Sequence, residues 1–303
     1  MAKNVFLHTC TSYTWRYLVP LHAAIDFGLT NIDAVLRDPD GKIQTFILPS
    51  NYQPVTAQLE AVLGLYGHPL ADFEWIAVTG GQFRQLPTTF GGARLLPVNE
   101  VPAIGRGGLY LAGLDSQGKK GKAKQNGRAL VVSAGSGTAI VAARGCQAHH
   151  VTGSAVGGGT LQGLGRLLLG TADACEIDRL AQQGNANAAD LTLAEAIGST
   201  VGRLPADANA VNFGRLARQA ADLSPEDLAA ALVRLVGQVI AVIAINAARA
   251  EKLDTVVVLG HLADLPSFRQ VMDTTAGYYQ ASITVPDQPG FGTAIGALLC
   301  AEE

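Results

Sequence analysis

The chain of 303 residues has a mass of 31.4 kDa, which fits one large domain or two domains of ordinary size. Hydrophobic residues make up 48% of the chain and charged residues 16%, so it can fill a large core and is not disordered as a whole. A formal net charge of −3 gives no general attraction to nucleic acid or to an anionic membrane surface.

The cysteines are far apart in the sequence and form no CxxC pair. They are Cys10, Cys146, Cys175 and Cys300. This spacing indicates neither a zinc ribbon nor a disulfide framework, so a reducing cytoplasm is the expected location. Residues 1–22 lack the long apolar segment of a signal peptide, and we interpret them as an N-terminal extension or a misassigned start.

The first half of the chain is predicted to open with an antiparallel sheet. Residues 23–36 (AAIDFGLTNIDAVL) predict a strand, a tight turn at Asp-x-Gly and a second strand. A DPDG turn then leads to a third strand at 42–48. The later elements of this half are predicted as a helix at 55–66, a buried strand at 75–79 and a helix at 100–114.

The second half repeats this opening. Residues 128–143 (RALVVSAGSGTAIVAA) again predict a strand, a small-residue turn and a strand. Between the halves, residues 116–126 (SQGKKGKAKQN) predict a solvated lysine-rich loop, with phosphate binding as the alternative. The later predicted elements are a glycine-led helix at 157–170, a long apolar helix at 225–253, a buried strand at 255–260 and a helix at 290–299.

Strands that alternate with helices predict an α/β protein. We expect an N-terminal domain at 23–115 and a C-terminal domain at 127–303. Polar residues such as Arg234 and Gln238 interrupt the helix at 225–253, so it is predicted to be buried or to face another subunit rather than to cross a membrane.

The two strand-connecting turns carry the first candidate binding groups. The first turn places Asp26, Gly28 and Thr30 within five residues. The second turn has no charge and contributes Gly135, Ser136, Gly137 and Thr138. Small residues at a single hairpin turn are ordinary, but two such turns facing each other would clamp a polyphosphate through main-chain donors. Asp26 would then face a phosphate-bound Mg²⁺, which prefers carboxylate and water ligands.

Two glycine clusters are further candidates. Gly157, Gly158 and Gly159 place bare backbone at a helix N-terminus, which suits an anion or a flat ring, although a flexible loop is the alternative. Gly80 and Gly81 follow a predicted strand, where a loop either approaches a ligand or makes a tight turn.

His149 and His150 are adjacent, and neighbours on a strand point to opposite faces, so they are not expected to ligate one metal together. A surface pair is one interpretation. The other is that one of them lines a substrate pocket.

These motifs, in this order, resemble the type II pantothenate kinases, a branch of the actin-like ATPase and sugar-kinase superfamily. The resemblance rests on Asp-x-Gly-x-Thr, SAGSGT, VGGGTLQGLGRLLLG, ANAVNFGRL (208–216), VVVLG and GTAIGALL, and it runs from about Ala23 to the C-terminus. It implies duplicated actin-like (ribonuclease H-like) α/β domains with a nucleotide cleft between them. It also implies a homodimer that transfers the γ-phosphate of ATP to pantothenate at the start of coenzyme A synthesis.

By position, the resemblance assigns ATP contacts to both turns and to the glycine-rich loop. The implied nucleotide residues are Asp26, Gly28, Thr30, Gly135, Ser136, Gly137, Thr138, Gly157, Gly158, Gly159, Thr160 and Leu161, with Asp26 toward Mg²⁺. Gly80, Gly81 and His150 fall in the implied acceptor region. Glu100 matches a family glutamate near the start of a helix.

The sequence departs from the family pattern at several positions. Leu29 replaces a glycine of the first turn, and Asp33 stands where the family has a lysine. The resemblance places a catalytic glutamate after the Thr-Gly-Gly turn, but residues 79–88 contain no acid. His150 occupies the position of an arginine that holds pantothenate, and a neutral imidazole does not replace a bidentate guanidinium.

We therefore expect an ATP- and Mg²⁺-dependent phosphotransferase for a small hydroxyl compound, either pantothenate or another acceptor. Asp33 and Glu100 are the candidate catalytic acids, and Arg84 and Arg106 are candidate replacements for the lost positive charge. The missing acid and arginine motivate a second hypothesis, a regulatory pseudokinase that binds ATP without catalysis. A third hypothesis is an ATPase that activates a partner enzyme.

Overall fold

The computed structural model describes residues 21–38, 40–51, 53–115, 127–218 and 222–303. The predicted N-terminal extension, apart from its last two residues, and the predicted lysine-rich loop at 116–126 lie outside the described residues.

The first sheet has the strand order β3-β2-β1-β4-β6-β5. Strands β1, β2 and β3 are antiparallel neighbours, as predicted, whereas β4 and β6 run parallel to β1. The strand bounds are β1 Leu21–Phe27, β2 Asn31–Arg37, β3 Ile43–Pro49, β4 Phe73–Gly80, β5 Thr89–Phe90 and β6 Ala93–Pro97. The parallel strands β1 and β4 therefore end at the same edge of the sheet.

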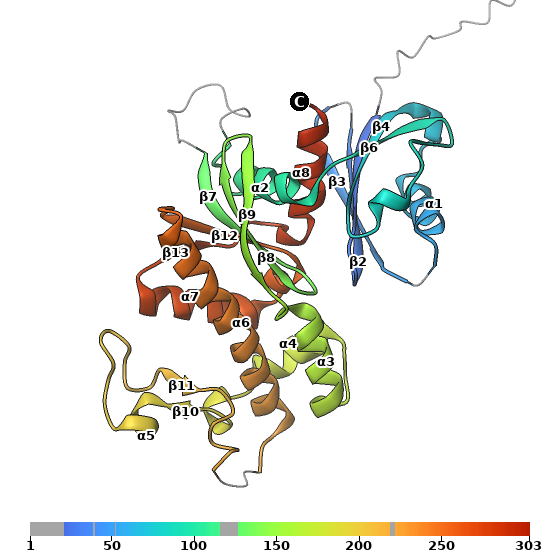
Figure 1. Cartoon of the computed structure of the whole chain (residues 1–303). Coiled ribbons are helices and arrows are strands. Elements are labelled where there is room, and N and C mark those ends of the chain that lie inside the picture. Colours follow the sequence, from blue (N-terminus) through green and yellow to red (C-terminus); the bar gives the residue numbers. More distant parts are fainter. Residues whose placement is uncertain (1–20, 39, 52, 116–126, 219–221) are drawn as a thin grey trace, which may run out of the picture.

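The second sheet repeats the plan in the order β13-β12-β7-β8-β9 (Figure 1). Strands β7, β8 and β9 are antiparallel, and β12 and β13 run parallel to β7. The bounds are β7 Arg128–Ala134, β8 Thr138–Arg144, β9 Gln147–Ser154, β12 Thr255–Leu259 and β13 Ser282–Thr284. The predicted duplication is confirmed, and β9, which the sequence analysis did not predict, is the counterpart of β3.

The helices predicted from the sequence are confirmed, with ends shifted by a few residues. Their bounds are α1 Val55–Tyr66, α2 Glu100–Leu111, α3 Gly158–Leu169, α6 Pro225–Ala250 and α8 Gly292–Ala301. The structure adds α4 Ala174–Ala181, α5 Leu193–Ile197 and α7 Pro266–Tyr279, together with a small sheet formed by β10 Leu191–Thr192 and β11 Asn209–Val211.

Helices α2 and α8 cross each other between the two sheets (Figure 1). Helix α2 follows the first sheet in sequence but contributes Ile104 and Leu109 to a core cluster with β7, β8 and β12. Helix α8, at the end of the chain, contributes Ile295 and Leu298 to a cluster with β1, β2 and β4. We call the first sheet with α1 and α8 the first lobe, and the second sheet with the other helices the second lobe. The exchange of helices ties the lobes together along one side.

Small residues allow the backbones of α2 and α8 to approach closely. A Cβ atom added at Gly296 would lie 1.8 Å from the carbonyl oxygen of Ala103, so this position needs glycine. Gly296→Ala is expected to cost about 1–3 kcal/mol of stability through overpacking. Gly277→Ala, on α7, is the matched control because its added Cβ meets no atom within 4 Å. Chemical denaturation of both variants measures the difference, and equal stabilities would contradict the predicted close crossing.

Helix α6 is a core helix of the second lobe. By length and composition alone it is apolar enough to cross a bilayer, and 61% of its most apolar window is buried in the described part of the chain. It begins at a Ser224 cap, whose hydroxyl accepts a hydrogen bond from the Asp227 N–H. Phe268 of α7 and Leu232 and Ile240 of α6 belong to the same core cluster, so the burial fits the predicted core helix.

Candidate nucleotide site

The two small-residue turns meet between the lobes. Thr30, from the turn after β1, and Ser136, from the turn after β7, have their hydroxyl oxygens 2.7 Å apart. Gly28 permits the first turn because a Cβ there would lie 2.6 Å from the carbonyl oxygen of Asn31. Leu29, at the tip of that turn, is 76% exposed. The structure thus brings together the two turns that the sequence analysis expected to face each other.

The glycine triplet packs against the second turn. The N–H groups of Gly158 and Gly159 donate to the carbonyl oxygens of Gly135 and Ser136, at 2.7 and 2.9 Å. These two N–H groups are therefore occupied, in contrast to the expected free anion-binding backbone. The triplet instead fixes the turn by close approach, since a Cβ at Gly157 would lie 2.6 Å from the carbonyl oxygen of Ser136.

Two threonines among the predicted nucleotide residues hold the backbone of the glycine-rich loop through hydrogen bonds. The Thr138 hydroxyl donates to the carbonyl oxygen of Val156 at 2.8 Å, and the Thr160 hydroxyl donates to that of Ala155 at 3.1 Å. Leu161 is fully buried in the core of the second lobe. Its side chain therefore packs α3 against that core.

Gly157→Ala is therefore expected to push the glycine-rich loop away from the second turn and to weaken nucleotide binding by about tenfold, because loop positions matter at the scale of 1 Å. Gly163→Ala, on the same helix, is the matched control because no atom lies within 4 Å of its added Cβ. Calorimetric titration of both variants with ATP measures the effect. Equal affinities in the two variants would show that the packing does not position the nucleotide.

Asp26 is a half-buried acid of this region. It lies at the end of β1, directly opposite Asp33 of β2 and beside Thr79 of β4, so the three side chains share one face of the sheet. Burial, together with the negative charges of Asp33 and Glu100, raises the pKa of Asp26 to about 8, against a lowering contribution from His261.

Gly80 lets the chain pass close to Asp26. Its φ of 93° is in the left-handed region, and a Cβ there would lie 2.5 Å from Oδ1 of Asp26. The next residue, Gly81, donates its N–H to the carbonyl oxygen of Phe27 at 3.2 Å. These glycines therefore join the end of β4 to the first turn.

The side chain of Asp33 is hydrogen-bonded to His261 of the second lobe. Its Oδ1 atom lies 2.8 Å from Nε2 of His261, and Nδ1 of His261 lies 2.8 Å from Oδ2 of Asp264. Burial raises the pKa of Asp33 above its ordinary value, although the hydrogen bond to His261 offsets part of this rise. The sequence analysis missed His261; its only signal was its place directly after the glycine that ends the predicted strand at 255–260.

Glu100 begins α2 and is exposed. Its carboxylate is close enough to Asp26 to raise the pKa of that group. An acid therefore does face this region, although residues 79–88 supply none. We call Asp26, Thr30, Glu100, Ser136 and His261 the interlobe site.

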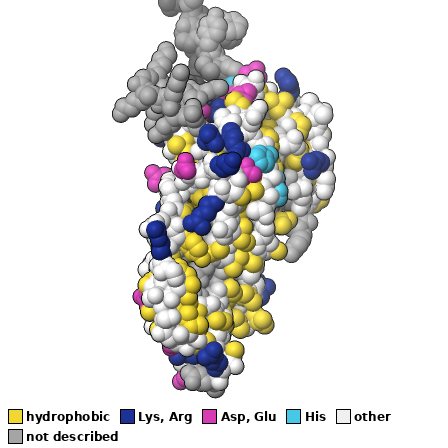
Figure 2. Space-filling view, turned by 60° about the vertical axis from the view of Figure 1, so that its left-hand side comes forward, with side chains coloured by type: hydrophobic (Ala, Val, Ile, Leu, Met, Phe, Trp, Pro, Cys, Tyr) yellow, Lys and Arg dark blue, Asp and Glu magenta, His cyan; other side chains and the backbone are white. Residues whose placement is uncertain are grey.

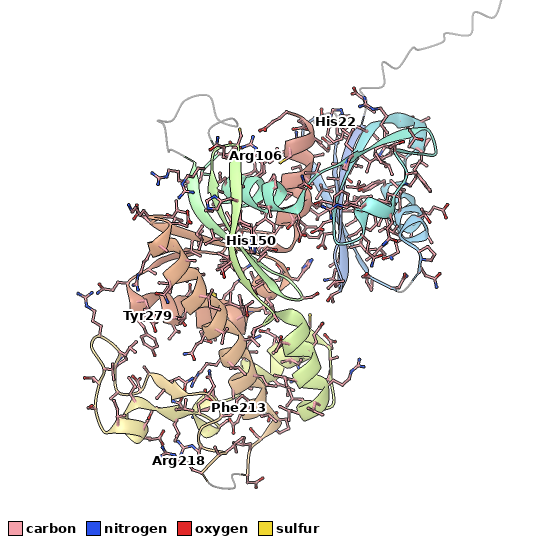
Figure 3. The ribbon with its side chains drawn as sticks, viewed as in Figure 1. His22, Arg106, His150, Phe213, Arg218 and Tyr279 are labelled. Carbon is pink, nitrogen blue, oxygen red and sulfur yellow. The ribbon has the colours of Figure 1, made fainter. Side chains whose placement is uncertain are left out.

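The remaining candidates lie elsewhere. His150 is exposed on β9 (Figure 3). Its neighbour His149 pairs with Glu251 at 3.4 Å. Arg84 is exposed and stacks on the ring of Phe83. Arg106, the other candidate replacement for the lost positive charge, is only 6% exposed. Arg106 forms ion pairs with Asp115 and Glu303 at 2.7 and 3.0 Å, so its guanidinium group already has carboxylate partners within the folded chain.

Two cavities of about 300 and 370 Å³ lie on another side of the second lobe, between α6, α7 and the segment around Asn209. No residue of the interlobe site lines them. The chemistry-bearing groups therefore gather at the strand ends, which is where α/β sheets usually bind ligands.

Duplicated sheets with opposed turns define the class of this protein as an actin-like ATPase fold. Component A of (R)-2-hydroxyglutaryl-CoA dehydratase from Acidaminococcus fermentans has a similar structure, with a TM-score of 0.63 at 14% identity, covering 93% of this chain and 97% of that one. A ROK family glucokinase from Streptomyces griseus, in complex with glucose and AMPPNP, has a TM-score of 0.53 at 15% identity, covering 92% and 98%. At these identities the likeness establishes the fold alone.

Sequence comparison gives the particular family. The family model described as Fumble matches residues 116–299, more than half of the chain. Type II pantothenate kinases from Oceanobacillus iheyensis and Staphylococcus haemolyticus are both 29% identical to it. The alignments cover 76% of this chain and 82% of the first relative, and 84% of this chain and 90% of the second. The chain belongs to the Fumble family, that of the type II pantothenate kinases, and the predicted resemblance is confirmed. These matches support a kinase that uses ATP.

Proposed function

We propose that this protein transfers the γ-phosphate of ATP to a hydroxyl group of a small metabolite, with pantothenate as the first acceptor to test. The meeting of Thr30 and Ser136 beside Asp26, in a chain of this family, is the observation that carries the proposal. The two turns would hold the phosphates, and the acceptor would approach the γ-phosphate from the side of Gly80 and Gly81.

The residues present fit a magnesium ion that arrives with the nucleotide. Asp26 is a half-buried carboxylate with a raised pKa, and the hydroxyl of Thr79 beside it is buried without a hydrogen-bond partner in the described structure. The described residues contain no cluster of three or more His, Cys, Asp or Glu side chains that could hold a metal alone. Mg²⁺ is usually bound by one or two carboxylates together with phosphate oxygens. Asp26 would hold this ion, which would neutralise phosphate charge.

Glu100 is the better of the two candidate catalytic acids. Asp33 is buried and its carboxylate is committed to His261, so it is poorly placed to take a proton from an incoming hydroxyl. Glu100 is exposed and lies near Asp26. We infer that Glu100 orients the acceptor hydroxyl and accepts its proton as the γ-phosphate is transferred.

The deciding experiment is a γ-phosphate transfer assay with Mg²⁺-ATP, pantothenate and a panel of other small hydroxyl compounds, alongside calorimetric titration with ATP. We expect binding and transfer to at least one acceptor. If ATP does not bind, both the proposed kinase and the pseudokinase are wrong.

The second candidate function is the regulatory pseudokinase, which the lack of an acid at residues 79–88 and the presence of His150 favour. Binding of ATP without transfer to any acceptor would support it. Acceptor-independent ATP hydrolysis would instead support the ATPase that activates a partner.

We also propose a cytoplasmic homodimer. Large apolar side chains are exposed around β10 and β11, and Figure 2 shows hydrophobic side chains gathered on this side of the second lobe. They are Ile197, Val201, Val211 and Leu216. Light scattering after gel filtration tests the dimer, and a monomer mass would refute it.

A further inference from the structure

His261 sits at the point where the second lobe touches the first. It follows Gly260, whose φ of 93° turns the chain at the end of β12, and it begins the short helix η4 (His261–Asp264). A Cβ at Gly290 would lie 2.2 Å from Cε1 of His261, so the imidazole packs against bare backbone. The ring of Phe291 meets it edge-on, with centroids 5.8 Å apart. The ring of His261 is therefore held in one orientation.

Both ring nitrogens of His261 face carboxylate oxygens at 2.8 Å, those of Asp33 and Asp264. A carboxylate only accepts hydrogen bonds, and a neutral imidazole carries a single N–H, so donation to both acids requires the imidazolium ion. Burial lowers the pKa of His261, but its hydrogen bonds to Asp264 and Asp33 outweigh this and raise the pKa to about 10. The ring is thus a cation near neutral pH.

The hydrogen-bonded bridge Asp33–His261–Asp264 connects the two lobes through residues that are far apart in the sequence. Asp33 belongs to β2 of the first lobe, whereas His261 and Asp264 belong to the second. Asp33 is 7% exposed and Asp264 is exposed, so the ion pair runs from the interior to the surface. Charged hydrogen bonds of this kind fix geometry more strongly than neutral ones.

The bridge also sets the charge beside the proposed phosphate site. Asp33 lies directly opposite Asp26 in the β1–β2 register, and Glu100 adds a third nearby acid. A nucleoside triphosphate would bring further negative charge to these acids. The positive charge of His261 lowers the pKa of Asp26 and is in direct contact with Asp33, so it offsets part of this repulsion.

We propose that His261 is a positioning residue of the interlobe site: as an imidazolium ion it clamps the lobes together through Asp33 and Asp264, and it cancels the charge of Asp33 so that a polyphosphate can approach Asp26. The part of this inference that concerns the polyphosphate rests on the proposed function. The clamp itself does not.

Three variants test the charge cancellation: His261→Asn, Asp33→Asn and the double variant. His261→Asn leaves the Asp33 carboxylate buried without its cation, so the dissociation constant for Mg²⁺-ATP should rise by about tenfold or more. Asp33→Asn removes the same contact without leaving a buried anion, so it should bind Mg²⁺-ATP more tightly than His261→Asn does. The double variant, with neutral amides at both positions, should return to within about threefold of the native affinity.

Two outcomes overturn the proposal. If His261→Asn binds as tightly as the native protein, the cation is not needed. If the double variant is as weak as His261→Asn, the ring acts only by its shape, because a purely structural role would not be rescued by removing the acid.

A measurement without nucleotide tests the clamp independently. In nitrogen-detected NMR of the native protein at pH 8, we expect the His261 ring to carry two N–H groups, and this signal should disappear in His261→Asn. A neutral His261 ring at pH 8 overturns the clamp. If the imidazolium signal is present but the native protein binds no ATP, the clamp stands and the proposed function has failed.

Discussion

Glu100→Gln is expected to lower the rate of phosphoryl transfer by about 10²–10⁴, because a positioned general base typically contributes that much. Glutamine keeps the size of the side chain and its place at the start of α2 but cannot accept a proton. The affinity for ATP should change little, since the phosphates are proposed to be held by the turns at Thr30 and Ser136. The loss should therefore appear in kcat rather than in the ATP dissociation constant.

Glu60→Gln is a matched control for this variant. Glu60 is also an exposed helical glutamate, but it lies on α1 of the first lobe. Transfer rates of the two variants, each measured at saturating ATP with the acceptor found for the native protein, separate a local role from a general charge effect. Native-like transfer by Glu100→Gln would show that the proton goes elsewhere.

Local patterns in the sequence were sufficient to predict most of the fold. The alternation of apolar residues on either side of Asp-x-Gly and of SAGSGT predicted both hairpins, and a duplicated opening predicted two similar sheets. The strand β9 was missed because most of its residues are polar and none is buried, so they lack the apolar signal of a buried strand. The crossing of α2 and α8 was also missed, because it depends on which sheet each helix packs against, which short-range spacing does not contain.

The candidate site was predictable only where a motif is local. The sequence indicated that Thr30 and Ser136 belong to equivalent turns, and the structure brings them together. The bridge between Asp33 and His261 joins residues 228 positions apart and has no motif, so only the folded chain reveals it. The same applies to the ion pair between Arg106 of α2 and Glu303, which follows α8. Pairings of this kind arise from tertiary structure rather than from spacing.

Asp26→Asn is expected to stabilise the nucleotide-free protein and to abolish its Mg²⁺-dependent affinity for ATP. The pKa of Asp26 rises from 3.8 to about 8 on folding, chiefly because the carboxyl group is buried. Between these two pH values the unfolded chain has lost the proton and the folded chain retains it. The contribution of Asp26 to the free energy of unfolding is therefore full below pH 3.8, falls as the pH rises, and is lost by about pH 8.

Asparagine has no proton to lose, so the variant should escape this loss and be more stable than the native protein at pH 8 by an amount on the order of a few kcal/mol. Thermal unfolding from pH 5 to pH 9 measures it, with Asp40→Asn, an exposed residue of the β2–β3 turn, as the control. Native Mg²⁺-ATP binding should release a proton below pH 8, because the ion requires the carboxylate, and calorimetry in buffers of different ionisation enthalpy detects this release. A variant that is less stable than the native protein at pH 8, or that still binds ATP in a Mg²⁺-dependent manner, would show that Asp26 serves the fold rather than the nucleotide.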